Sequence, residues 1–91
     1  MKKAKKYIVK GRVQGVGFRY FTNHIANRIG VYGYVKNLWD GSVEVYAIGT
    51  EQQLVTLKTG LSKGPSYSYV EKIIEEEDSV NPDYYNFSVK F

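Results

Sequence analysis

The chain has 91 residues and a net charge of +4; 43% of its residues are hydrophobic and none is cysteine. These values are those of one globular domain over residues 1–91, and they exclude a disordered chain, disulfide bonds, thiol chemistry and a cysteine-based metal site. The basic charge fits anionic partners, no apolar run is long enough to span a membrane, and the missing cysteines suit a cytoplasmic location.

The first stretch of the chain predicts a strand followed by a helix. Apolar and polar residues alternate over residues 7–13, which is typical of a strand with one buried face. Residues 18–29 then change to helical spacing, and Gly30 is a natural residue to end the helix. One apolar stripe runs along this predicted helix and consists of Phe18, Phe21, Ile25, Ala26 and Ile29.

A hairpin and a second helix come next. Residues 31–37 and 42–49 are rich in Val and Tyr, and they predict two strands joined by an Asp-Gly turn. Residues 50–62 predict a helix that begins with the capping-box spacing of Thr50 and Gln53. The buried stripe of this helix and its end are marked by Leu54, Leu57, Leu61 and then Gly64-Pro65.

Two more strands are predicted near the end of the chain. Residues 67–77 have a less regular pattern, whereas residues 84–91 alternate clearly. The order is therefore β-α-β-β-α-β plus a final strand. The simplest packing is an α+β, ferredoxin-like sandwich: an antiparallel sheet with two helices on one face and the fifth strand at a sheet edge.

The segment between the first strand and the first helix has the features of an anion site. Gly15 and Gly17 allow backbone N–H groups to turn toward a common point, and the start of a helix favours negative charge. Arg19 would add a guanidinium fork that matches phosphate oxygens. We expect a phosphate or carboxylate cradle at residues 14–19. The alternative is a plain strand-to-helix turn with a solvated arginine.

Asn37 is the second candidate site residue. It ends the predicted second strand, and its amide can both donate and accept a hydrogen bond. Near a bound phosphate it could hold and aim a water molecule. The alternative is that Asn37 only caps the following turn, as asparagine often does. Spacing alone leaves both interpretations open.

Two segments of the chain resemble the signatures of the acylphosphatase family. The first is Gly11-Arg12-Val13-Gln14-Gly15-Val16-Gly17-Phe18-Arg19, and the second is Gly33-Tyr34-Val35-Lys36-Asn37 with Gly41 following. The resemblance covers residues 9–49 and agrees with the family's ferredoxin-like fold. It also extends to the N-terminal module of hydrogenase-maturation carbamoyltransferases, but a chain of one module favours the stand-alone enzyme.

The resemblance implies an enzyme that hydrolyses the carboxyl–phosphate bond of small acyl phosphates, without metal, cofactor or covalent intermediate. It implies that Arg19 binds the phosphate and that Asn37 orients the attacking water. Because an asparagine side chain does not accept a proton at neutral pH, our own hypothesis is that a phosphate oxygen of the substrate is the base. Inorganic phosphate would be product and inhibitor, and we expect a monomer that binds neither nucleic acid nor membrane. The backbone cradle would consist of Gln14, Gly15, Val16, Gly17, Phe18 and Arg19.

Two other classes of function fit parts of the sequence. The same element order builds the RNA-recognition motif, in which Tyr32, Tyr34 and Tyr46 could stack bases on an open sheet face. The predicted third strand lacks the Gly-aromatic element of that motif, and the motif does not account for residues 14–19. A partner-binding domain without chemistry is the other alternative, but the presence of both Arg19 and Asn37 is evidence against it.

Several remaining features have plainer interpretations. His24 is the only histidine and is expected to be a surface residue of the first helix. The acidic residues 75–78 predict a solvated strand end rather than a cation site. Trp39 is expected to pack over the hairpin turn, with a place at the pocket as the alternative. The basic residues 1–6 predict a partly frayed terminus without a targeting peptide.

Overall fold

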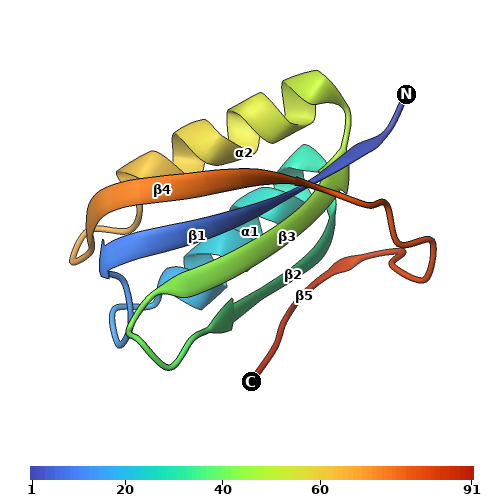
Figure 1. Ribbon diagram of the computed structural model, residues 1–91. Helices are drawn as coiled ribbons and strands as arrows, with labels where there is room; N and C mark the ends of the chain where they lie inside the picture. The colour runs from blue at the N-terminus through green and yellow to red at the C-terminus, as the bar shows by residue number, and fades with distance from the viewer.

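The computed structural model describes residues 1–91 and confirms the ferredoxin-like element order. Both helices cover the same face of one sheet, with α2 over β4, β1 and β3 and α1 over β2 and β5 (Figure 1). Neither helix has the length and apolar character needed to cross a membrane. The elements are β1 (Lys3–Arg12), α1 (Phe18–Ile29), β2 (Tyr32–Asn37), β3 (Val43–Gly49), α2 (Glu51–Lys63), β4 (Tyr69–Asp78) and β5 (Phe87–Val89).

The sheet has the strand order β4-β1-β3-β2-β5. The first four strands pair antiparallel, as predicted, but β5 pairs parallel to β2. β5 is also shorter than the alternation over residues 84–91 suggested, because only Gly33, Tyr34 and Val35 of β2 offer a partner. β4 begins at Tyr69 rather than residue 67, since Ser68 is still held in a turn by the Pro65 carbonyl.

The basic N-terminal segment is more ordered than the sequence suggested. β1 begins at Lys3, where pairing with β3 already starts, and β4 flanks it from Ala4 onward. Ala4 is buried against Tyr46 and Ile48 on the sheet face that the helices leave open. A strand with neighbours on both sides and a buried residue near its start does not fray, so the predicted loose segment shrinks to the first two residues.

The main core lies between the helices and the sheet. α2 buries the predicted leucine stripe, and its N-terminus has the predicted capping box between Thr50 and Gln53. α1 buries Phe18, Thr22 and Ala26, whereas the Phe21 side chain is partly exposed. Strand residues Tyr7, Val9, Val35, Val43 and Val45 complete the contacts from the sheet.

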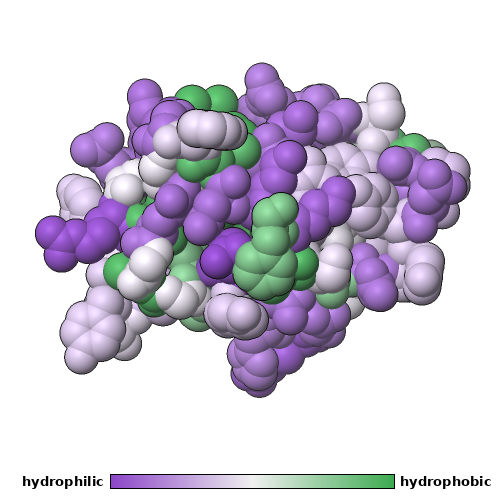
Figure 2. Space-filling model, turned by 90° about the horizontal axis from the view of Figure 1, so that it is seen from below, coloured by the Kyte–Doolittle hydropathy of each residue, from purple (hydrophilic) through white to green (hydrophobic).

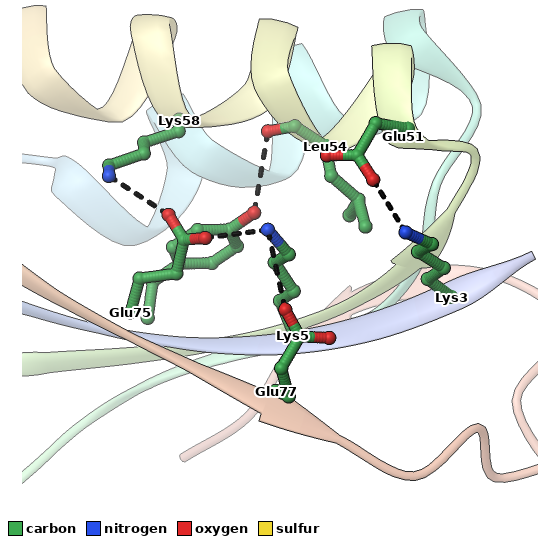
Figure 3. A network of polar contacts seen from close by, with 8 residues as sticks. Lys3, Lys5, Glu51, Leu54, Lys58, Glu75 and Glu77 are labelled. Carbon is green, nitrogen blue, oxygen red and sulfur yellow. Dashed lines mark hydrogen bonds and ion pairs between the residues drawn. The ribbon is translucent and has the colours of Figure 1, made fainter.

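A network of charged residues fastens α2 to the sheet edge (Figure 3). Glu75 accepts from Lys5 at 2.6 Å and from Lys58 at 2.9 Å, and Lys3 pairs with Glu51 at 2.7 Å. The hydrogen bond from Lys5, followed by that from Lys58, lowers the pKa of Glu75 below its ordinary value. Residues 75–78 are exposed at the end of the edge strand β4, as predicted, and Glu75 in addition joins this strand to β1 and α2.

Tyr7 lies at the base of this network. Its hydroxyl donates to the Leu54 carbonyl of α2 at 3.3 Å, and its ring is buried in the core. Burial raises the pKa of the Tyr7 hydroxyl to about 12. The largest cavity, about 460 Å³, is the groove beside these charged groups. The charged side chains that line this groove all form ion pairs, so none of them is left unpaired to bind a charged ligand.

Candidate functional site

The loop between β1 and α1 turns on two glycines. Gly15 and Gly17 have φ values of +74° and +80°, which favour glycine, and a Cβ atom at either position would meet nothing within 4 Å. Gly17 is the N-cap of α1 and offers no side chain to the first-turn N–H groups, and that turn contains no acidic residue. The loop therefore presents free donors and a positive helix end to an open space.

This open space is a pocket of about 100 Å³ at one end of the sheet. It brings Arg19, from the first turn of α1, to the same cavity as Asn37, from the end of β2. The full lining consists of Val13, Gly15, Gly17, Phe18, Arg19, Tyr20 and Asn37. Five of the seven predicted site residues therefore line one pocket, and the arrangement offers backbone N–H groups, a guanidinium and an amide to an anion.

Gln14 and Val16, the other two predicted residues, do not line the pocket. The Gln14 side chain donates from Nε2 to the carbonyls of Leu38 and Ser42, each at 2.8 Å. Val16 packs against the main core. Gln14 thus ties the β1–α1 loop to the β2–β3 turn that follows Asn37, a role that its place in the predicted backbone cradle did not suggest.

Arg19 is held by two residues that were not predicted to lie at the site. Its Nη1 donates to the Lys90 carbonyl at 3.4 Å, and its guanidinium lies 4.7 Å from the centre of the Phe91 ring. These neighbours are about 70 positions away in the chain. They reach Arg19 because β5 runs parallel to β2 and ends at the same side of the sheet as Asn37. No local pattern signals such a contact.

Asp40, rather than Asn37, organises the β2–β3 turn. Its carboxylate accepts from the Ser42 hydroxyl, from the Ser42 N–H at 3.0 Å and from Lys10 Nζ at 3.1 Å. The Ser42 hydroxyl, followed by its N–H and by Lys10, lowers the pKa of Asp40 well below its usual range. Asn37 makes no side-chain hydrogen bond of this kind, so its amide is free to act toward the pocket.

Trp39 does not pack over this turn, as had been expected. Its side chain is fully exposed and does not line the pocket. Hydrogen bonds of Asp40 and Gln14 close the turn without the indole ring. His24 is exposed on α1, as predicted. No group of three or more histidine, cysteine or carboxylate side chains could hold a metal ion.

Tyr34 and Tyr46, two of the three tyrosines considered for stacking with RNA bases, do not have free rings on the open sheet face. Tyr34 stacks on Tyr46 at 5.6 Å, and Tyr84 from the β4–β5 connection lies within 6 Å of both rings. Tyr46 is only 5% exposed, and Lys90 Nζ lies 4.3 Å from the Tyr34 ring centre. These three tyrosine rings pack against one another, so they form a small second core and not a surface on which bases could stack.

The surface around β5 is mostly polar. Seen from below Figure 1, purple residues dominate and the green apolar residues form small separate patches (Figure 2). A broad apolar patch, the usual mark of a stable protein interface, is absent from this view.

Comparison with known proteins agrees with the two sequence signatures. Residues 5–89 match the family model described as Acylphosphatase. The acylphosphatase of Pasteurella multocida (strain Pm70) is 52% identical over 87 residues, which are 96% of this chain and 97% of that protein. An acylphosphatase from Bacillus subtilis matches with a TM-score of 0.93 and 37% identity over the whole of both chains. Full-length HypF matches at 0.88 and 26% identity, over all of this chain and 12% of that one.

Proposed function

Because this chain belongs to the acylphosphatase family, we propose that it hydrolyses the carboxyl–phosphate bond of acyl phosphates in the pocket shared by Arg19 and Asn37. The observation that carries this proposal is the convergence of a glycine loop, a helix N-terminus, a guanidinium and a free amide on one small cavity. We further propose that the active species is a monomer.

The phosphoryl group binds between the backbone of residues 14–19 and the guanidinium of Arg19. Phosphoryl transfer spreads negative charge over the equatorial oxygens, and fixed donors around them stabilise that charge. The contacts of Arg19 with the Lys90 carbonyl and the Phe91 ring hold the guanidinium in place before substrate arrives. Preorganised donors of this kind need no rearrangement during the reaction.

Asn37 holds the attacking water opposite the carboxylate leaving group. The water oxygen forms a bond to phosphorus, the bond between phosphorus and the carboxyl oxygen breaks, and a phosphate oxygen of the substrate takes the proton. The lining contains no histidine, lysine or carboxylate side chain that could take this proton. A carboxylate leaves without a strong acid, so the reaction proceeds without a metal ion.

The test is hydrolysis of benzoyl phosphate, measured by ultraviolet absorbance with EDTA present and with inorganic phosphate as competitor. Arg19→Ala should remove nearly all activity and weaken phosphate inhibition, whereas Arg28→Ala, in the last turn of the same helix, is the matched control. Asn37→Ala should lower kcat by roughly 100-fold, as loss of one fixed transition-state partner often does. Parent-like rates for both site variants would refute the assignment.

A further inference from the structure

The pocket is small, with a volume of about 100 Å³, and its lining includes the exposed residue Tyr20. If the phosphoryl group fills the cradle, as the proposed function requires, the acyl group must lie beyond it, against the rim. The residues at the rim then decide which acyl groups gain additional contacts.

Tyr20 has the most exposed aromatic ring of the lining. It is 64% exposed, whereas the Phe18 ring beside it is buried in the core. Tyr20 makes no side-chain hydrogen bond or ring contact within the molecule, in contrast to the tyrosines of the open sheet face. Tyr20 and Arg19 both belong to the first turn of α1, and both line the same pocket.

Two other exposed aromatic residues near this end of the sheet are weaker candidates. The Phe91 ring lies over the Arg19 guanidinium, and that face of the ring is occupied. Trp39 is two residues past Asn37, but it does not line the pocket. Tyr20 is therefore the aromatic residue that both borders the cavity and has its ring faces free.

We propose that Tyr20 is a specificity-determining residue whose ring packs against the acyl group of the substrate. A tyrosine side chain presents a flat apolar body, and aromatic pairs gain energy from offset or edge-to-face contact. The favoured substrates are thus acyl phosphates with an aromatic or bulky apolar acyl group. A substrate with a single methyl group, such as acetyl phosphate, reaches little of the ring. This assignment rests on the proposed acylphosphatase activity.

The experiment compares kcat/KM for benzoyl phosphate and acetyl phosphate in the parent and in Tyr20→Ala. The ratio of the two values should fall about 3- to 10-fold in the variant, the range expected for loss of one aromatic contact. Alanine is a strong helix former, so α1 tolerates the change at this exposed position. Tyr20→Phe should keep the parent ratio, because the ring and not the hydroxyl makes the contact.

Tyr85→Ala is the matched control. Tyr85 is also a highly exposed tyrosine, but it lies in the β4–β5 connection, at the opposite end of the sheet from the β1–α1 loop (Figure 1). Its loss should leave the ratio unchanged. An unchanged ratio in Tyr20→Ala, or an equal loss for both substrates, would overturn the role of Tyr20 alone. A parent enzyme that hydrolyses neither substrate would overturn the proposed function together with it.

Discussion

Replacing Gln14 by leucine tests whether one side chain holds the two halves of the pocket together. The change removes two hydrogen bonds, to the carbonyls of Leu38 and Ser42. Each carbonyl keeps a second donor: the Gly41 N–H for Leu38 at 3.3 Å, and the Leu38 N–H for Ser42 at 2.9 Å. Neither oxygen is left unpaired, so the loss is two ordinary net hydrogen bonds, about 2 kcal/mol. For a domain of this size, Tm should fall by about 8–16 °C.

The effect on catalysis should exceed the effect on phosphate binding. The cradle and Arg19 belong to the β1–α1 loop and α1, whereas Asn37 belongs to β2, and Gln14 joins the two sides. Without the two hydrogen bonds of Gln14, the Asn37 amide that holds the water moves relative to the phosphate. We expect kcat for benzoyl phosphate to fall about 10- to 100-fold, since displacements near 1 Å have effects of that size. The inhibition constant of phosphate should change much less.

Gln14→Glu sharpens the test, because it keeps the shape and removes the donor. At pH 7 its carboxylate would face two carbonyl oxygens, so it should unfold at lower urea concentration than Gln14→Leu. Below about pH 4 the protonated acid regains one donor, and the difference in stability between Gln14→Glu and Gln14→Leu should become smaller. A Gln14→Leu variant with parent stability and parent kcat would show that the hydrogen bonds to the turn do not organise the site.

Three further perturbations test other contacts. Gly33→Ala, at φ +143°, directs a methyl group into the β3 backbone. In urea unfolding, this variant should lose about 3 kcal/mol or more of its free energy of unfolding, whereas Gly41→Ala, whose methyl group meets no neighbour, should lose about 1 kcal/mol. Equal losses in the two variants would contradict the contact with β3. The folded pKa of Glu75 lies below 4.5 because two lysines donate to it. Its stabilisation is therefore full above pH 4.5 and is lost as the pH falls through the folded value, so parent and Glu75→Gln should converge in acid; a constant difference would count against the pairing. Phe91→Ala uncovers the Arg19 guanidinium and should raise KM about 2- to 5-fold with little change in kcat, and steady-state kinetics with an unchanged KM would refute this.

Local sequence patterns were enough to predict the elements and the fold. The helical period over residues 18–29 gave the bounds of α1, because a glycine in the left-handed region lies at each end. The capping box of Thr50 placed the start of α2 within one residue. These glycines and the capping box lie within a few residues of the helix ends that they determine, so local interactions are enough to predict them.

Contacts between distant strands could not be predicted in the same way. The alternation near the end of the chain indicated a strand, but not that β5 would pair parallel to β2 over three residues. The ordering of Lys3 depends on its pairing with Gly49 of β3, and that of Ala4 depends also on Asp78 of β4, both far away in the chain. The contacts of the Gln14 side chain could not be predicted either, because no periodic pattern in the sequence indicates that an amide donates to two carbonyls of another loop.

The pairing of β5 links the stability of the sheet edge to the phosphate cradle. Backbone bonds at 2.8 Å hold β5 at each end, from the Gly33 N–H to Asn86 and from the Lys90 N–H to Val35, and Phe87 anchors it in the core. Opening of this short edge strand would take the Lys90 carbonyl away from Arg19.

An anion that needs Arg19 in place should therefore keep β5 closed, by the reciprocity of linked equilibria. We expect inorganic phosphate to slow hydrogen exchange of the Lys90 amide, at most about tenfold at ten times its Kd. Amides at the centre of α2 serve as the control in the same mass-spectrometric experiment. If exchange at Lys90 is the same with and without phosphate, while phosphate still inhibits the enzyme, the cradle does not depend on β5, and the loop and helix alone hold Arg19.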